Sequence, residues 1–272
     1  MCVLVVAAFD HPRYDLVVAA NRDEFHDRPA APAGPWPGLP GVYAGRDLEA
    51  GGTWLGVDTR GRFAAVTNVR GAGMGAGQLS RGFLVRDYLR DAKANAESFA
   101  HGLTPQARRY AGVNFLAFDA TSGAAWSNVD ARVQTVHPGV YGLSNGAFDE
   151  EWPKTTRLKQ GYAALRHLDG EPLIDALLAL LRDRALPQDP ALPNTGIGLE
   201  RERWLAPVFI EGDGYGTRCS TVVLRERGVR LSLAERRYDA HGGSTGEERF
   251  ELALERHPAA LATTPDRRAP AR

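Results

Sequence analysis

The chain has 272 residues, of which 43% are apolar and 24% charged, as is typical of a soluble globular protein. Its 33 basic and 33 acidic residues balance, so the charge does not suggest nucleic acid or an anionic membrane as a partner. No apolar run approaches the roughly 20 residues of a membrane span, and the first residues lack the basic start of a signal peptide. The two cysteines, Cys2 and Cys219, form neither a disulfide framework nor a zinc motif. We therefore expect a cytoplasmic protein without a metal site or bound cofactor.

The first 21 residues predict a β-hairpin. An apolar strand over 2–9 is followed by a turn at 10–13 and a return strand over 14–21. Both strands are apolar almost throughout, which is typical of strands covered on both faces. Folding back across the turn places position 2 opposite positions 20–22, so we expect Cys2 to lie beside Asn21 and Arg22.

The rest of the chain predicts strands, then helices, then strands again. We expect a Pro-rich surface loop or lid at 29–41, strands at 52–58 and 62–68, a Gly-rich stretch at 71–77, helices at 80–92 and near 94–101, strands at 114–119, 124–128 and 140–143, helices at 153–168 and 172–183, an irregular stretch at 184–204, and strands at 206–210, 217–225, 229–235 and 247–254. This order favours an α+β fold with antiparallel sheets and outer helices.

We expect one domain over 1–257 and a disordered tail over 258–272, which is rich in Ala, Pro, Thr and Arg. The Gly-rich stretch loosely resembles a dinucleotide-binding loop, but it is not followed by a ribose-binding acid on a βαβ unit, so nucleotide binding is not predicted. Both 29–41 and 71–77 are expected to border the mouth of a pocket.

Cys2 is the first candidate for chemistry. Cys is small enough at this position for Met1 to be trimmed, which would leave a thiol and a free α-amine on one residue. Their pKa values of about 8.5 and 7.7–8.0 suit a nucleophile and a proton acceptor near neutral pH. If Met1 is retained, the nitrogen of Cys2 is an amide and cannot act as a base. Alternatively, Cys2 is simply a small apolar residue of a buried strand.

Four consecutive polar residues, Asn21 to Glu24, follow the second strand. If the strand continues, alternation places Arg22 and Glu24 on one face and Asn21 and Asp23 on the other, with one pair facing Cys2. A carboxylate there would hold the α-amine, and a guanidinium would lower the pKa of the thiol. Alternatively, the strand simply ends in solvent.

Three further polar residues occupy notable positions. Asn68 and Asn145 each end a predicted strand, where Asn is either a turn residue or a side-chain donor to an oxyanion. Arg218 lies within a strand, where its burial requires a partner. If Arg218 faces the site, alternation turns Cys219 away, so Cys219 is not expected to be a second catalytic thiol.

Several motifs occur together in a specific order: Met1-Cys2, Asn21-Arg22-Asp23-Glu24-Phe25, Gly51-Gly52-Thr53-Trp54-Leu55-Gly56, Thr67-Asn68, Tyr141-Gly142-Leu143-Ser144-Asn145 and Tyr215-Gly216-Thr217-Arg218. From Cys2 to about residue 254 this set resembles the NRDE family, also called the transport-and-Golgi-organisation-2 family. That family is similar to the N-terminal nucleophile hydrolases, especially the cysteine amidases that include penicillin V acylase and bile salt hydrolase. The resemblance implies a four-layer αββα sandwich with Cys2, the nucleophile, at the start of a central strand.

The resemblance also implies roles for individual residues. The Asn21–Asp23 cluster matches the Arg-and-Asp motif of the hydrolases in a different order. Asn68 and Asn145 match their two Asn positions, with Asn145 the better oxyanion candidate, and Arg218 matches their late active-site Arg. Position 219 is atypical, because other members carry Ser or Thr there. The predicted catalytic residues are Cys2, Arg22, Asp23, Asn145 and Arg218, and the predicted substrate contacts are Asn21, Asn68 and Trp54.

The leading hypothesis is an amide hydrolase or acyl transferase that acts on a small acyl or amide substrate. The alternative is a non-catalytic protein that handles haem, acyl-CoA or lipid, because the resemblance extends to animal members associated with these ligands. No CxxCH or Cys-Pro motif supports haem in this chain. A purely structural role is disfavoured by the polar cluster at 21–24.

Overall fold

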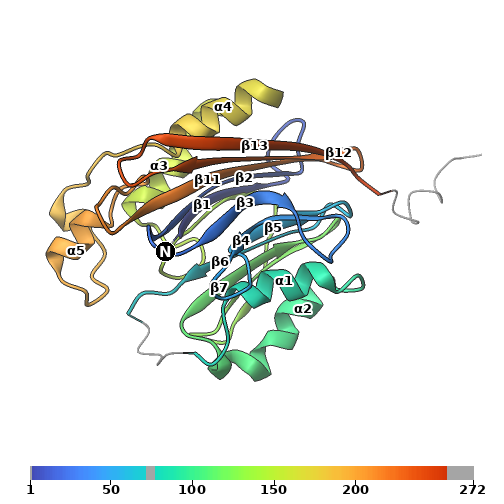
Figure 1. Cartoon of the computed structure of the whole chain (residues 1–272), viewed down its shortest axis with the longest axis horizontal. Helices are drawn as coiled ribbons and strands as arrows, with labels where there is room; N and C mark the ends of the chain where they lie inside the picture. The colour runs from blue at the N-terminus through green and yellow to red at the C-terminus, as the bar shows by residue number, and fades with distance from the viewer. Residues whose placement is uncertain (1, 72–76, 256–272) are drawn as a thin grey trace, which may run out of the picture.

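Two antiparallel sheets lie face to face between two layers of helices in the computed structural model, which describes residues 2–71 and 77–255 (Figure 1). Sheet A has the order β10-β1-β2-β11-β12-β13, with bounds β1 Cys2–Ala8, β2 Leu16–Phe25, β10 Gly139–Leu143, β11 Tyr215–Glu226, β12 Arg230–Tyr238 and β13 Ser244–Ala253. Sheet B has the order β3-β4-β5-β6-β7-β8-β9, with bounds β3 Ala30–Pro35, β4 Val42–Asp47, β5 Leu55–Asp58, β6 Phe63–Asn68, β7 Val113–Phe118, β8 Gly123–Ser127 and β9 Val133–Thr135.

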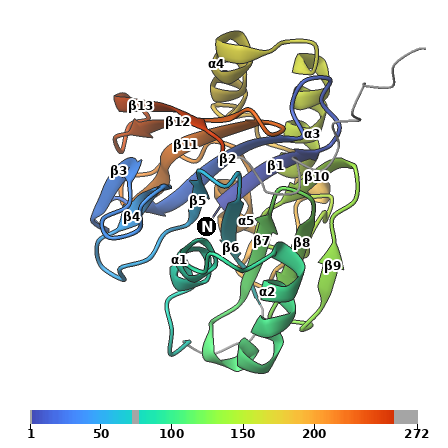
Figure 2. The same cartoon turned by 90° about the vertical axis from the view of Figure 1, so that its right-hand side faces the viewer.

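The helices cover the outer faces of the sheets (Figures 1 and 2). Their bounds are α1 Gly82–Arg90, α2 Ala96–Leu103, α3 Pro153–Leu165, α4 Gly170–Leu180 and α5 Leu199–Trp204, with short 3₁₀ turns at Thr104–Arg109 and Asp189–Ala191. The helices α3 and α4 pack on sheet A, whereas α1 and α2 pack on sheet B. The expected α+β fold with αββα layers is confirmed.

The central strands of each sheet are buried on both faces, which explains the continuous apolar runs of β1, β2, β6 and β7. In β1, Leu4 and Val6 face the layer between the sheets, while Val3 and Val5 face α3 and α4. Both faces of the strand therefore remove apolar surface from water, at roughly 25 cal/mol per Å². The expected coverage of the first hairpin on both faces is confirmed.

The predicted register of the first hairpin is also confirmed, because Cys2 pairs with Arg22. Strand β2 continues to Phe25, so the polar cluster lies inside the sheet. Residues paired across strands share a face, which places Arg22 on the inner face with Cys2. Asn21 points to the opposite side, toward the helices, and so does Asp23.

Two segments have a structure different from the one predicted. The Pro-rich stretch 29–41 contains strand β3, which is tolerated because β3 is an edge strand and an edge does not need every N–H. Residues 206–210 do not form a strand. The N–H of Phe209 donates to the carbonyl of Asp183, and the N–H of Ile210 donates to the Thr217 hydroxyl, so this apolar run is bonded without a strand partner.

Other expected features differ in smaller ways. Strand β9 was not predicted, and α5 lies within the stretch expected to be irregular. The centre of the Gly-rich stretch, 72–76, and the expected disordered tail, 258–272, lie outside the described residues. The single-domain boundary at 257 stays a prediction. In the described part of the chain, no helix combines the length and apolar character needed to cross a membrane.

Candidate functional site

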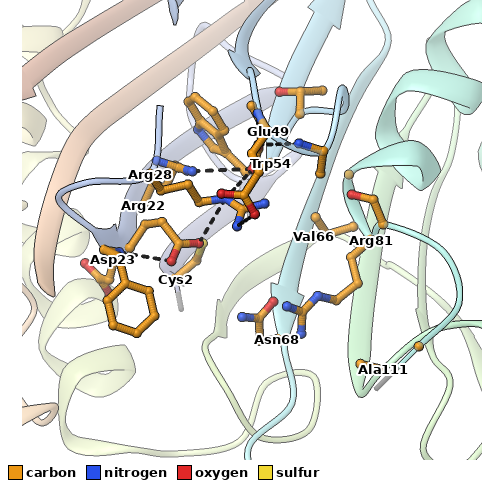
Figure 3. Close-up of a pocket in the computed structure, with 18 of the residues that line it drawn as sticks. Cys2, Arg22, Asp23, Arg28, Glu49, Trp54, Val66, Asn68, Arg81 and Ala111 are labelled. Carbon is orange, nitrogen blue, oxygen red and sulfur yellow. Dashed lines mark hydrogen bonds and ion pairs between the residues drawn. The ribbon is translucent and has the colours of Figure 1, made fainter. Parts of the chain in front are cut away.

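A cleft of about 1130 Å³ opens at the end of the sandwich where β1 begins (Figure 3). Its walls come from β1, β2, β6 and β11, from the segments around α1 and α5, and from residues 47–54. The stretch 29–41 does not line it, so the expectation that this stretch borders the pocket was wrong; of the Gly-rich stretch, Gly77 does line it. Among residues 2–71 and 77–255, no group of three or more His, Cys, Asp or Glu is placed to hold a metal ion.

Cys2 forms part of the cleft wall and is half-buried. Its carbonyl accepts a hydrogen bond of 3.1 Å from the Ser144 hydroxyl, which ties this end of β1 to β10. Burial raises the pKa of the Cys2 thiol, while the positive charge at the chain's amino terminus and that of Arg22 oppose the rise. Burial therefore disfavours the thiolate form of Cys2, and the nearby positive charges favour it.

Arg22 and Trp54 form one unit beside Cys2. The guanidinium carbon of Arg22 lies 4.3 Å from the centre of the Trp54 ring, and Arg22 Nη2 lies 3.7 Å from Asp47 Oδ2. A Cβ on Gly45 would lie 2.4 Å from the Trp54 ring, so a side chain there would displace the indole. Both Arg22 and the predicted substrate contact Trp54 line the cleft.

Asp23 lies on the other face of β2 and is fully buried, although it also reaches the cleft wall. Its Oδ1 accepts a hydrogen bond of 2.7 Å from the Thr217 hydroxyl, and its carbonyl accepts one of 3.0 Å from the Tyr215 hydroxyl. Burial raises the pKa of Asp23, opposed by Lys154 and by the amino terminus. In the late motif, Thr217 thus holds the carboxylate of Asp23, and Tyr215 holds its main-chain carbonyl.

Lys154 was missed by the sequence analysis. It is 2% exposed, and its Nζ donates a hydrogen bond of 3.1 Å to the carbonyl of Leu205. Burial lowers the pKa of Lys154 to about 8, an effect that the charge of Asp23 opposes. A sequence signal existed: Lys154 is the second residue of α3, where the helix dipole disfavours a cation.

Asn68 and Asn145 occupy different positions around the cleft. Asn68 lines the cleft, whereas Asn145 is fully buried and is not part of the wall. The side-chain Nδ2 of Asn145 donates a hydrogen bond of 2.9 Å to the Asn68 carbonyl. Extending the pairing of Leu4 with Leu143 by two residues places Asn145 beside Cys2. Asn145 therefore supports the wall, and Asn68 presents an amide to the space in front of Cys2.

Arg218 does not line the cleft, contrary to its predicted role. The pairing of β11 with β2 shifts between Thr217 and Cys219, so Arg218 is the extra residue of a β-bulge. Its Nη1 donates to the carbonyls of Phe25 and Arg28, at 2.6 and 3.1 Å. The bulge also overturns the prediction that Cys219 faces away from the Cys2 side of the sheet, because Cys219 pairs with Arg22 and so shares its inner face.

Asn21 is a structural residue rather than a wall residue of this cleft. Its Nδ2 donates to the carbonyls of Leu181 and Val208, at 2.8 and 2.9 Å. Its Oδ1 accepts a hydrogen bond of 2.6 Å from the Ser220 hydroxyl. These contacts tie sheet A to the segments that follow α4 and α5, so the amide has no free group for the predicted substrate contact.

Comparisons with known proteins match most of this chain. Residues 1–240 match the family described as Transport and Golgi organisation 2. The bovine Transport and Golgi organization protein 2 homolog is 33% identical over 87% of this chain and 92% of its own length, and the human homolog is 30% identical over the same shares. The Drosophila melanogaster protein is 29% identical over 89% of this chain and 95% of its own length.

Solved structures with a similar course of the chain are more distant. A Caenorhabditis elegans N-acylethanolamine-hydrolyzing acid amidase ortholog is 12% identical, with a TM-score of 0.48 over 82% of this chain and 92% of its own. A C2A mutant of conjugated bile acid hydrolase from Clostridium perfringens is 6% identical, with a TM-score of 0.47 over 93% and 92%. The family match over residues 1–240 and the extent of the bovine and human alignments are decisive: this chain belongs to the Transport and Golgi organisation 2 family.

Proposed function

We propose that the cleft is the active site of an amide hydrolase or acyl transferase whose nucleophile is Cys2, acting on a small acyl or amide substrate after removal of Met1. One observation carries the proposal: Cys2 begins a central strand and faces a cleft whose wall also holds Arg22, Asp23 and Asn68. A nucleophile, two charge-setting groups and an amide donor on one wall are the parts that acyl transfer needs.

In the first step, the Cys2 thiolate attacks the substrate carbonyl carbon, so a C–S bond forms and the carbonyl oxygen becomes an oxyanion. The thiol proton passes to the α-amine that Met1 removal exposes. Collapse of the oxyanion then breaks the C–N bond, and the α-ammonium returns this proton to the departing amine. Water, or a second amine in acyl transfer, attacks the thioester and regenerates the thiol.

The remaining residues would act on charge and position. The side-chain amide of Asn68 would donate to the oxyanion, and Asn145 would position Asn68 through its bond to the Asn68 carbonyl. The Asp23 carboxylate would hold the α-ammonium, with Thr217 fixing the carboxylate. The guanidinium of Arg22 would favour the thiolate, while its contact with Trp54 keeps it beside Cys2.

Intact mass and covalent labelling of the purified full chain test this proposal together. We expect loss of one methionine and stoichiometric labelling of Cys2 by an activated acyl ester, mapped by peptide mass spectrometry. Cys2→Ala should abolish the labelling. Cys219→Ala is the matched control and should keep it, because Cys219 is buried.

Retention of Met1 together with unchanged labelling in the Cys2→Ala variant would sink the amidase proposal. The alternative from the family resemblance, a carrier of haem or acyl-CoA, would then be examined by titrating haemin and looking for a saturable absorbance change at stoichiometric protein.

A further inference from the structure

Opposite charges on one wall of the cleft neutralise each other. Arg28 Nε lies 2.8 Å from Asp47 Oδ2, and Arg28 Nη1 lies 2.8 Å from Glu49 Oε1. Arg22 also approaches Asp47, at 3.7 Å. The carboxylates of Asp47 and Glu49 on this wall are therefore already engaged by arginines of the protein.

Arg81 differs from these arginines. It lines the cleft, yet no carboxylate of the described residues lies within 4.0 Å of its guanidinium. A long hydrogen bond of 3.4 Å joins Nη1 to the carbonyl of Gly112. In Figure 3 the side chain extends from the α1 side into the cleft, and its guanidinium ends near Asn68. Within residues 2–71 and 77–255, most of its five N–H donors have no other acceptor and face the cleft.

The backbone that carries Arg81 is held firmly. Gly82 is the first residue of α1 and packs on the segment that precedes β5. Its carbonyl accepts a hydrogen bond of 3.2 Å from the N–H of Thr53. A Cβ on Gly52 would lie 2.6 Å from the carbonyl carbon of Gly82, so only glycine permits this approach. The motif Gly51-Gly52-Thr53-Trp54 therefore fixes both the Trp54 wall and the starting point of the Arg81 side chain.

A half-buried cation without a counter-ion in direct contact has an energetic cost. Burial lowers the pKa of Arg81, while the charges of Cys2 and Glu24 oppose this shift, and the guanidinium stays protonated. Such a cost is offset when a ligand supplies the missing negative charge, and a guanidinium matches carboxylate, sulfonate and phosphate groups through paired N–H bonds.

We propose that Arg81 binds an anionic oxyacid group of the substrate, placed away from the bond that Cys2 attacks. The preferred substrates are acyl compounds that carry such a group, and Arg81 determines this specificity. The class of reaction rests on the function proposed above, but the anion site rests on the cleft geometry alone.

Paired substrates test this specificity. The probes are mono-4-nitrophenyl esters of succinate, adipate and suberate, each compared with its neutral methyl ester. A charge-assisted hydrogen bond is worth roughly 1.5–3 kcal/mol, so we expect Arg81→Gln to lower kcat/KM for the best acid about 10- to 150-fold. The neutral partner should change less than about twofold, and Arg81→Lys should restore part of the loss.

Arg90→Gln is the matched control. It removes the same charge from the same helix at an exposed position outside the cleft wall, so it should leave the preference for acids unchanged. Equal losses for acid and neutral substrates in Arg81→Gln, or a preference that survives this substitution, would overturn the anion site.

A binding measurement separates this inference from the proposed chemistry. The Cys2→Ala variant is titrated calorimetrically with adipic acid monoanilide and with its methyl ester. Tighter binding of the acid that disappears in Cys2→Ala/Arg81→Gln supports the site, even if the wild-type chain labels and hydrolyses nothing. Equal affinity for acid and ester, or binding of neither, contradicts it.

Discussion

The two ends of the sandwich use buried charge in opposite ways. At the end away from the cleft, Arg225 is 1% exposed and its Nε lies 2.7 Å from Asp15 Oδ1. Its Nη1 donates to the carbonyls of Gly61 and Asp119, at 2.7 and 2.6 Å. One guanidinium of sheet A thus bonds to loop carbonyls beside sheet B, although its buried Nη2 has no hydrogen-bond partner among the described residues.

At the cleft end, charged groups surround open space. Cys2, Asp23 and Arg81 all line the cleft, and each has its pKa changed chiefly by burial. The same strands, β2 and β11, run between the two ends. The comparison shows that buried charge alone does not mark a site. The distinguishing feature is whether the buried charged groups contact one another or face a cavity.

Arg225→Met should have the largest effect on stability. Removing one partner of a buried ion pair typically costs about 3–5 kcal/mol, and here it leaves the Asp15 carboxylate with only the exposed Arg227, whose Nε lies 3.3 Å from Asp15 Oδ2. Urea unfolding should show this loss, while Cys2 labelling of the folded fraction stays unchanged. If Arg225→Met abolished Cys2 labelling in fully folded protein, the reactivity of the cleft end would depend on the ion pair at the other end of the sandwich.

Asn68→Ala should have the largest effect on turnover with little effect on stability. Removal of an oxyanion donor typically costs about 10²–10³-fold in kcat. Asn145→Ala is the comparison: it removes a fully buried side chain and its hydrogen bond to the Asn68 carbonyl, and should lower the free energy of unfolding by about 1–3 kcal/mol. An unchanged kcat in folded Asn68→Ala would show that Asn68 is not the oxyanion donor.

The pH dependence of stability should reveal Lys154. Its pKa is lowered from 10.5 to about 8, so between these values the unfolded chain binds the proton that the folded chain has released. The contribution of Lys154 to stability therefore rises with pH in this window, by up to about 3 kcal/mol at 1.36 kcal/mol per pH unit. Lys154→Met should lack this rise when the free energy of unfolding in urea is measured at pH 8 and pH 10. An equal rise in the wild-type chain and in Lys154→Met would show that another group causes it.

Gly45→Ala should have the smallest effect. The added Cβ would meet the Trp54 ring at 2.4 Å, and overpacking of this kind typically costs about 1–3 kcal/mol. Because the displaced indole no longer supports Arg22, we also expect slower Cys2 labelling at neutral pH. Gly34→Ala is the control, since a Cβ there meets nothing within 4 Å. Equal labelling rates in Gly45→Ala and Gly34→Ala would show that the position of Trp54 does not affect the reactivity of Cys2.

Much of the cleft end was predictable because it depends on local alternation. The apolar run before Asn21 and the turn at 10–13 indicate the pairing of Cys2 with Arg22, and the structure has this register. Alternation within β2 also separates Arg22 from Asp23 correctly, because strand periodicity is a property of consecutive residues. The Asn21 side chain has the predicted orientation relative to Arg22, but its partners are carbonyls of distant segments.

Local sequence patterns suffice to predict the first hairpin, its register and the face on which each residue of the polar cluster lies. Contacts formed on folding set which distant residues reach the cleft. The bulge removes Arg218 from it, the bond from Asn145 to the Asn68 carbonyl selects Asn68 as the exposed amide, and the packing of Gly82 on Gly52 directs Arg81 into it. The physical reason is that alternation propagates along one strand, whereas a bulge, a cross-sheet hydrogen bond or a helix-to-strand contact depends on segments that meet only after folding.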